Sequence, residues 1–273
     1  TGSGKTTTIQ GDASNVGLIE LSVQQLIGLI TSNGGSERWS LRLSYIEIYN
    51  ECVGDLLTGA SGLTMYDRKD GSVSVADLSE HEVTNWYDAT ALLRHGDANR
   101  HIGATVHNER SSRAHVICRL MLQRKATTSD PTACSSELNI CDLAGSERVS
   151  PHARGLPQAH IRGLEGGHIN KSLLVLSTVI QKLAEGRSSK PGLQHIPFRS
   201  SKITRLLQSS LSGDAATLII CTLTPAAAHA EETHNTLRFA MRAKTISLAP
   251  VNQARADPHP APSPRPRPRP RPR

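Results

Sequence analysis

Aromatic residues are scarce in this sequence of 273 residues, which contains two tryptophans, four tyrosines and two phenylalanines, or 3% in all. Hydrophobic residues nevertheless make up 37%, so a core must be built mainly from Leu, Ile, Val and Ala. Long apolar runs are also missing. None approaches the roughly 18 residues that a membrane span needs, and the longest, at 216–223, has the length of a buried strand. We therefore expect a folded domain that has no membrane partner.

Paired cysteines are absent as well. The five cysteines are an odd number, lie far apart and form no C-x-x-C pair. Three of them stand in apolar, strand-like runs, where cysteine behaves as a small hydrophobic residue. We therefore expect neither a zinc site nor a disulfide framework, and we expect a reducing compartment.

Excess charge is missing from most of the chain. The formal net charge is +7, but six arginines and one aspartate in 251–273 contribute +5, which leaves +2 for the body. The Pro-Arg pairs beyond Pro258 cannot form a core, so we expect them to be disordered or polyproline-like. Such an arm could bind an acidic protein surface or nucleic acid, because arginine suits carboxylate and phosphate partners. It could equally be an extension without a specific partner.

Helical and strand-like patterns alternate along the body of the chain. Apolar residues at helical spacing predict helices, and they occupy residues 19–30, 86–100, 169–183, 200–211 and 230–244. Shorter apolar runs predict strands at 41–49 (with one buried face), within 73–83, and at 115–123, 138–143 and 217–223. Residues 145–167 are rich in Gly and Pro and are expected to form a long loop. This alternation predicts an α/β domain with a mixed or mostly parallel sheet.

The chain opens on TGSGKTTT, which matches the end of a phosphate-binding loop. The full pattern is G-x-x-x-x-G-K-[ST], and its first glycine would stand two residues before Thr1. In such a loop backbone N–H groups converge on phosphate oxygens at a helix N-terminus, where the helix dipole favours anions. Lys5 would contact the outer phosphates, and the Thr6 hydroxyl would bind Mg²⁺. Taken alone, the match also fits the start of an ordinary helix.

Two further segments carry groups that suit a phosphate site. NERSSRAH at 108–115 gathers two hydroxyls, a guanidinium and an amide just before a predicted strand. DLAGSER at 142–148 places an acidic residue, followed by a glycine, at the end of the predicted strand at 138–143. P-loop enzymes hold magnesium and sense the γ-phosphate in this way. Taken alone, the first segment could be a polar turn with a helix cap, and the second could be the capped start of a helix.

Taken together and in this order, the three segments resemble the kinesin motor domain. Further matches are SYIEIYNECVGDLL, INKSLLVL, HIPFRSSKITRLL and THNTLRFAMRAK. The resemblance covers residues 1–246 and implies a P-loop NTPase of the kinesin motor fold, with a central mixed sheet flanked by helices. The N-terminal strands of that fold, including the one that leads into the P-loop, would be missing, so we expect a fragment or an incomplete gene model. NERSSRAHVICRL and VIQKLAEG most resemble the centromere-associated kinesin-7 subfamily.

The resemblance implies a site for ATP and Mg²⁺ between the P-loop and these two switch segments. The implied nucleotide-binding residues are Thr1, Gly2, Ser3, Gly4, Lys5, Thr6 and Thr7. The implied Mg²⁺ ligands are Thr6 and Ser112, with Asp142 acting through a water. The implied catalytic residues are Asn108, Ser111, Arg113, Gly145 and Glu147. Among these, the Gly145 N–H would sense the γ-phosphate, the Arg113–Glu147 salt bridge would close the site, and Glu147 would relay a proton from the attacking water. The family's third switch serine is Ala114 here.

The resemblance also implies binding to microtubules, whose tubulin surface is acidic. The implied contacts are Lys171, His195, Arg199, Lys202 and Arg205. The last three stand at three-residue spacing, near one face of a helix. For any one of these residues alone, a solvated surface position is the alternative. Because exposed charges are screened by salt, we expect microtubule binding to weaken as salt rises.

Three regions and one principal function follow. Residues 1–246 would form the motor domain, 247–254 a neck-linker-like segment and 255–273 a disordered tail. Because no heptad repeat follows, no dimer is expected from this chain. The expected function is a microtubule-stimulated ATPase motor in the cytoplasm, on the microtubule cytoskeleton, with the spindle as a candidate site. The alternatives are a catalytically impaired microtubule-binding fragment, because the sheet would be incomplete, and nucleic-acid binding through the tail, for which the evidence is compositional only.

Overall fold

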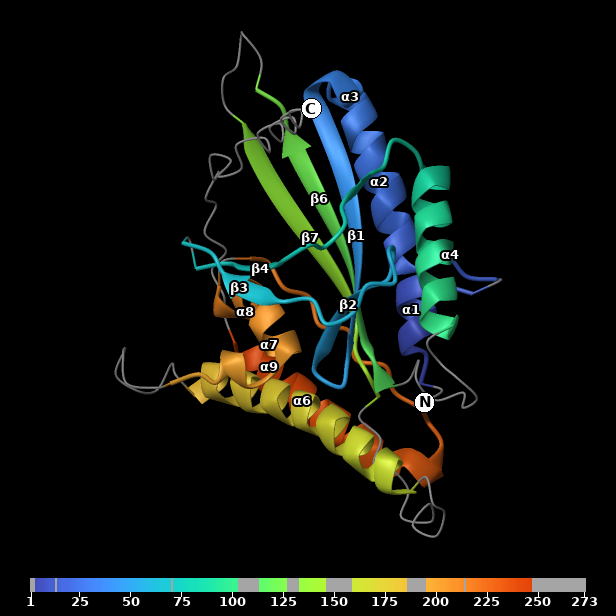
Figure 1. Cartoon of the computed structure of the whole chain (residues 1–273). Helices are drawn as coiled ribbons and strands as arrows, with labels where there is room; N and C mark the ends of the chain where they lie inside the picture. The colour runs from blue at the N-terminus through green and yellow to red at the C-terminus, as the bar shows by residue number, and fades with distance from the viewer. Residues whose placement is uncertain are drawn as a thin grey trace, which may run out of the picture.

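A single twisted sheet forms the centre of the molecule (Figure 1). The computed structural model describes residues 3–12, 14–69, 71–102, 113–126, 133–145, 159–185, 195–213 and 215–246. The strand order is β2-β1-β6-β7, and β5 pairs with β1. The bounds are β1 Trp39–Tyr49, β2 Cys52–Asp55, β5 His81–Glu82, β6 His115–Arg124 and β7 Cys134–Asp142. Every pairing between these described strands is antiparallel.

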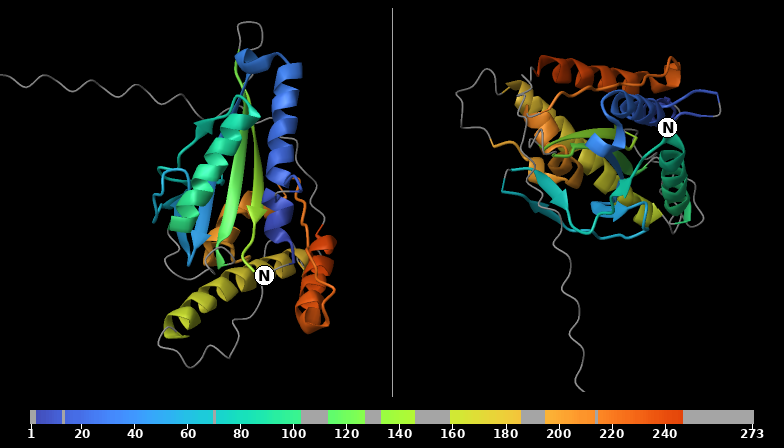
Figure 2. Two further views of the ribbon diagram at one scale, coloured as in Figure 1. Left: turned by 90° about the vertical axis from the view of Figure 1, so that its right-hand side faces the viewer. Right: turned by 90° about the horizontal axis from the view of Figure 1, so that it is seen from above.

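Helices cover the sheet and one of its ends. On one face lie α1 (Lys5–Gln10), α2 (Leu18–Ser32) and α4 (Trp86–Ile102) (Figures 1 and 2). Helices α6 (Ala159–Glu185) and α9 (Ala230–Thr245) pack together across the end where β6 begins and β7 ends. The shorter elements are α3 (Gly35–Arg38), η2 (Phe198–Ser200), α7 (Lys202–Leu206), α8 (Gln208–Ser212), η3 (Ala227–His229), and a separate sheet of β3 (Met65–Asp67) and β4 (Val73–Val75).

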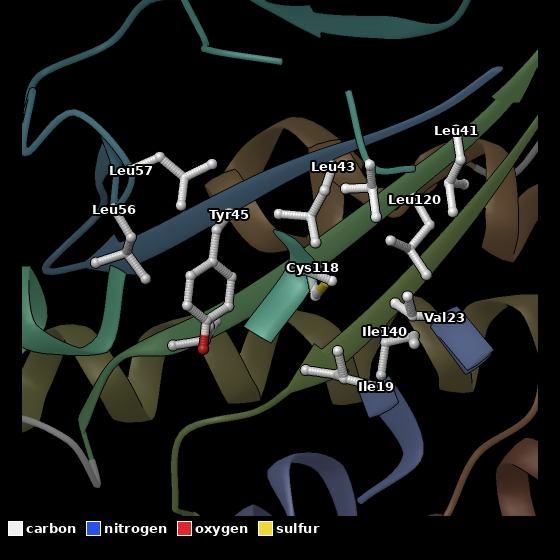
Figure 3. Close-up of a cluster of buried hydrophobic side chains, with 13 residues drawn as sticks. Ile19, Val23, Leu41, Leu43, Tyr45, Leu56, Leu57, Cys118, Leu120 and Ile140 are labelled. Atoms are coloured by element: carbon white, nitrogen blue, oxygen red, sulfur yellow. The ribbon is translucent and has the colours of Figure 1, made fainter. Parts of the chain in front are cut away.

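Strand β1 occupies the region where residues 41–49 predicted a strand, but it is buried on both faces instead of one. Leu43 and Tyr45 belong to a cluster that α2 and α4 cover, and Figure 3 shows Tyr45 extending from β1 into it. Ile46 and Ile48 belong to a second cluster with β4 and α7. Because elements pack on either side of β1, its polar residues Ser44 and Glu47 are also enclosed, whereas Arg42 stays exposed.

The turn between β1 and β2 fixes the position of α7. Tyr49 pairs with Cys52, so the loop has two residues, Asn50 and Glu51, both with positive φ (53° and 58°). This is the geometry of the hairpin turns whose twist matches that of the strands. Glu51 is an unusual residue in this conformation. Its carboxylate accepts hydrogen bonds from the Ser201 hydroxyl and the Lys202 N–H, both at 2.8 Å, and so caps the N-terminus of α7.

The predicted helices at 19–30, 86–100, 169–183 and 230–244 are confirmed as α2, α4, α6 and α9. The single helix predicted at 200–211 is wrong: extended backbone at Ser201 and a break at Leu207 divide it into η2, α7 and α8. The predicted loop at 145–167 is also wrong in its last part, because α6 already begins at Ala159. The last proline before this helix is Pro157, and the three glycines of its first turns each disfavour helix by only about 1 kcal/mol.

The predicted strand at 217–223 does not form. Residues 216–226 lie outside the described helices and strands, and Leu218 is 83% exposed. Extended backbone becomes a strand only when a neighbouring strand satisfies its N–H and C=O groups, and no described strand pairs with this segment. Strand β7 likewise pairs with β6 alone among the described strands, so its other edge is open.

Candidate nucleotide site and basic surface

Helix α1 presents the phosphate-binding residues at its first turn. Gly4 precedes it in the left-handed conformation (φ 91°), which glycine adopts without strain. Lys5 and Thr6 are the first two residues of the helix, and the N-terminus has no side-chain cap, so a ligand could use its N–H groups. The Ser3 hydroxyl lies 3.1 Å from that of Thr222. Thr1 and Gly2 lie outside the described residues.

A hydrogen bond joins the two predicted magnesium residues that the structure describes. The Thr6 hydroxyl donates to Asp142 Oδ2 at 2.9 Å, across 136 positions of sequence. Asp142 stands at the end of β7 and is 6% exposed, and its other oxygen, Oδ1, is buried without a hydrogen-bond partner among the described residues. A buried carboxylate oxygen without a partner is costly. A hydroxyl beside a carboxylate supplies the oxygen ligands that Mg²⁺ and its bound waters prefer, so these residues fit the ion.

The described parts of the two switch segments leave the sheet side by side. Val116 of β6 pairs with Asp142 of β7, which brings the start of one strand to the end of the other. Arg113 is half-buried just before β6, and Gly145 is buried just after β7. Asn108, Ser111, Ser112 and Glu147 lie outside the described residues, so the salt bridge between Arg113 and Glu147 remains a prediction.

His115 connects the two switch regions to α6, and sequence reasoning missed this role. Its Nδ1 accepts a hydrogen bond from the Ala144 N–H at 3.1 Å, so in the neutral ring Nε2 carries the proton and donates to the Ser172 hydroxyl at 2.9 Å. Burial lowers the pKa of His115 to about 4, from an ordinary 6.5. The imidazole is therefore neutral near pH 7 and links β6, the segment after β7, and α6.

A cavity of about 290 Å³ adjoins the P-loop on the side of α6 and α9. Lys5 and Ser3 line one wall, whereas Leu173, Leu176 and Phe239 line others. Most of its lining is apolar, so phosphate contacts in it would be confined to the P-loop wall. The open edge of β7 and the apolar segment at 219–223 lie at this same end of the molecule.

The five predicted basic contacts are exposed or half-buried, but Arg199, Lys202 and Arg205 do not lie on one helix. Lys171 and His195 are exposed and Lys202 is half-buried. Arg199 belongs to η2 and Arg205 to α7, yet both guanidinium groups reach Asp67 on β3, at 2.8 and 3.0 Å. The hydrogen bond from Arg205, more than any other contact, lowers the pKa of Asp67 below its ordinary 3.8. Asp67 was not expected from the sequence, because it stands more than 130 residues before its partners.

The described residues contain no group of three or more His, Cys, Asp or Glu side chains arranged to hold a metal ion. None of the described helices has the length and apolar character to span a bilayer. All five cysteines are free thiols. Burial raises the pKa of Cys118 and of Cys141 to about 12, so both are neutral near pH 7.

Known proteins match nearly the whole chain. A family model for the kinesin motor domain matches residues 1–246. The kinesin-like protein KIN-7D, mitochondrial, of Arabidopsis thaliana is 44% identical over 250 residues, covering 91% of this chain and 23% of the relative. The kinesin-like protein KIN-7L of Oryza sativa subsp. japonica is 43% identical over 263 residues, covering 94% of this chain and 40% of the relative. The chain therefore spans less than half the length of these curated relatives.

Solved structures show the same fold. A structure of a fast kinesin, described with its ATPase mechanism and interactions with microtubules, superposes with a TM-score of 0.79 at 36% identity, covering 92% of this chain and 70% of that one. A KIF14 dimer with AMP-PNP in complex with a microtubule superposes with a TM-score of 0.78 at 36% identity, covering 90% and 69%. These matches confirm the predicted fold class, and the KIN-7 relatives fit the predicted subfamily. The chain belongs to the kinesin motor domain family.

Proposed function

We propose that this chain is the core of a microtubule motor, in which hydrolysis of Mg·ATP is coupled to microtubule binding and movement. The hydrogen bond between Thr6 and Asp142 is the observation that carries this proposal. It joins two of the three expected magnesium residues, and the other oxygen of Asp142 is buried without a hydrogen-bond partner among the described residues. The match to the kinesin motor family supports the same reading.

In this proposal the P-loop binds the phosphates and the switch segments hold the attacking water. Lys5 and the N–H groups of the first turn of α1 contact phosphate oxygens, and the Gly145 N–H contacts the γ-phosphate. Thr6 and Ser112 would hold Mg²⁺ directly and Asp142 would hold it through a water, and the ion would neutralise charge on the phosphates. Glu147 accepts a proton from the water, and Arg113 holds Glu147 in place. Phosphoryl transfer depends mostly on such positioning and electrostatic stabilisation.

The track is proposed to be the acidic surface of tubulin. Arg199, Lys202 and Arg205 gather at one surface with Asp67 among them, and Lys171 lies exposed on α6. His115 ties α6 to both switch regions, which gives a physical connection between the nucleotide and this surface. We assign the motor to residues 1–246, a neck-linker-like segment to 247–254 and a tail to 255–273. The proposed location is the cytoplasm and the microtubules, with the spindle as a candidate; "mitochondrial" is part of one relative's name.

A second candidate is a microtubule-binding chain without catalysis. The open edge of β7 and the unpaired segment at 217–223 favour it, because both lie beside the P-loop and would leave Lys5 less firmly placed. Phosphate release from the chain with Mg·ATP, with and without microtubules, separates the two candidates.

Glu147→Ala is the informative variant in that assay, and Glu231→Ala, which removes an exposed carboxylate on α9, is its control. Stimulation by microtubules that Glu147→Ala abolishes and Glu231→Ala retains is the result expected for a motor. Absent turnover with retained microtubule binding would establish the second candidate. Unchanged turnover in Glu147→Ala would refute the role given to that residue.

A further inference from the structure

A buried tyrosine hydroxyl links helix α1 to helix α4 through the first strand of the sheet. Tyr45 of β1 is 0% exposed. Its hydroxyl accepts a hydrogen bond from Gln10 Nε2 at 2.8 Å and donates one to Asp97 Oδ1 at 3.0 Å. Burial and the neighbouring Asp97 both raise the pKa of Tyr45, so it keeps its proton near pH 7.

The direction of these two hydrogen bonds is fixed by chemistry. An amide nitrogen can only donate and an ionised carboxylate can only accept, whereas a hydroxyl does both with its single proton. The two hydrogen bonds can therefore run in one direction only, from Gln10 to Tyr45 and from Tyr45 to Asp97. Gly96, next to Asp97, allows α4 to lie against the ring, because a Cβ at this position would stand 2.5 Å from Tyr45 Cδ1.

Helix α1 packs Ile9 against the core cluster but has few other polar attachments. It is six residues long, about 9 Å, and none of its residues is buried. Two side-chain hydrogen bonds connect its described residues to other elements: Thr6 to Asp142 at the first turn and Gln10 to Tyr45 at the last residue. A magnesium ion would take a lone pair of the Thr6 hydroxyl and leave its proton on Asp142, so both hydrogen bonds can persist when nucleotide is bound, one at each end of the helix.

We propose that Tyr45 is a positioning residue for the nucleotide site: its hydroxyl fixes the end of α1 against β1 and α4, and so sets where Lys5 and Thr6 meet the phosphates. This inference rests on the proposed function and adds to it a residue that touches no ligand. Because α4 precedes the switch segment at 108–115 in the sequence, the same hydroxyl ties the P-loop helix to the helix before that switch.

Tyr45→Phe tests the inference, with Tyr87→Phe, at an 82% exposed tyrosine of α4, as its matched control. We expect Tyr45→Phe to weaken Mg·ADP binding, measured by titration calorimetry, about 3- to 10-fold, the size expected for one lost hydrogen bond. Backbone amides at 7–10 should exchange with deuterium faster by a similar factor, because the end of α1 opens locally. Tyr87→Phe should change neither quantity.

Reversing the hydrogen bonds separates positioning from packing. In Gln10→Glu two carboxylates compete for the single Tyr45 proton, so binding and protection should fall. In the double variant Gln10→Glu/Asp97→Asn the asparagine donates to Tyr45 and Tyr45 donates to the glutamate, so both should recover. These variants keep the ring and also decide the matter if Tyr45→Phe does not fold.

Wild-type exchange and Mg·ADP affinity in Tyr45→Phe would overturn the inference, as would a double variant no better than Gln10→Glu. If the wild-type chain does not bind Mg·ADP, the proposed function fails, but deuterium exchange in α1 still decides whether Tyr45 holds the helix.

Discussion

Asp142 and Asp67 are carboxylates on strands at different parts of the molecule, and they differ in how their oxygens are satisfied. Asp142 is nearly buried, accepts one hydrogen bond from Thr6 and has an oxygen without a partner among the described residues. Asp67 is exposed, and its two oxygens each face an arginine. The first arrangement costs free energy until a cation or water arrives. The second is complete without a ligand.

The contrast separates a site that is built around a ligand from a surface that is balanced within the chain. Asp67 offsets part of the positive charge that Arg199 and Arg205 offer to an acidic partner. The surface around Arg199 and Arg205 therefore carries less net positive charge than two arginines alone would give. At the nucleotide site, by contrast, the unpartnered oxygen of Asp142 favours binding of a cation. Three substitutions or titrations test this difference.

Asp142→Asn should have the largest effect. The amide oxygen can still accept the Thr6 hydrogen bond, but the negative charge that draws Mg²⁺ is gone. We expect Mg·ATP turnover to fall about 100-fold or more, in line with the loss of one electrostatic group at a reacting phosphate. Phosphate release measured over a range of Mg²⁺ concentrations checks this, and Glu231→Gln on α9 is the control. Full activity at ordinary Mg²⁺ would mean that the unpartnered oxygen serves no cation.

The buried His115 should make stability depend on pH. The folded chain holds the pKa of this imidazole at about 4, and the unfolded chain has the ordinary 6.5. Between these values the unfolded state binds a proton that the folded state refuses, so stability falls as pH falls from 6.5 toward 4 and is fully kept above 6.5. The gap between the two pKa values is worth about 3 kcal/mol.

Denaturant unfolding of the wild-type chain and of His115→Gln at several pH values between 4 and 7 isolates this effect, because other groups titrate alike in both. The wild-type curve should lose stability more steeply on acidification. If the unfolding free energies of the two proteins change with pH in parallel, His115 is not a neutral, buried imidazole in the folded chain.

Asp67→Asn should have the smallest effect of the three, and it should strengthen a function, microtubule binding, instead of weakening one. Removing the carboxylate leaves the charge of Arg199 and Arg205 uncompensated, so microtubule affinity should rise about 2- to 5-fold at low salt and converge with the wild type as salt screens the surface. Co-sedimentation across a salt series measures it, with Asp77→Asn as a surface control. Weaker binding would show instead that Asp67 holds the two arginines in the orientation that tubulin needs.

The sequence predicted those elements whose apolar pattern is long and regular. Helices α2, α4 and α9 were located from apolar residues repeated at helical spacing, and strands β1 and β6 from their apolar runs. Where the outcome depended on neighbours far away in sequence, local pattern failed. Residues 217–223 have a strand's composition without a partner strand, and β1 has a half-buried pattern although both of its faces are covered.

At the candidate site, too, local motifs predicted some residues, and residues that act through distant partners were missed. Thr6 and Asp142 were predicted through short motifs, and the structure places them 2.9 Å apart. Glu51, Asp67, Tyr45 and His115 were not predicted in their roles, because each acts through a partner that no local spacing reveals. A buried tyrosine reads from sequence as an apolar core residue, and the pairing of its hydroxyl with Gln10 and Asp97 exists only in three dimensions.

The open edge of β7 has a practical consequence for handling the protein. No described strand pairs with this edge, and Leu138 on β7 is 42% exposed. Leu218 and Ile220, in the segment without a described partner strand, are also exposed. Such an edge is a template on which further strands can add. Self-association of this chain in concentrated solution should therefore proceed through intermolecular β-structure. Its rate should rise with protein concentration and fall when a charged residue replaces Leu218.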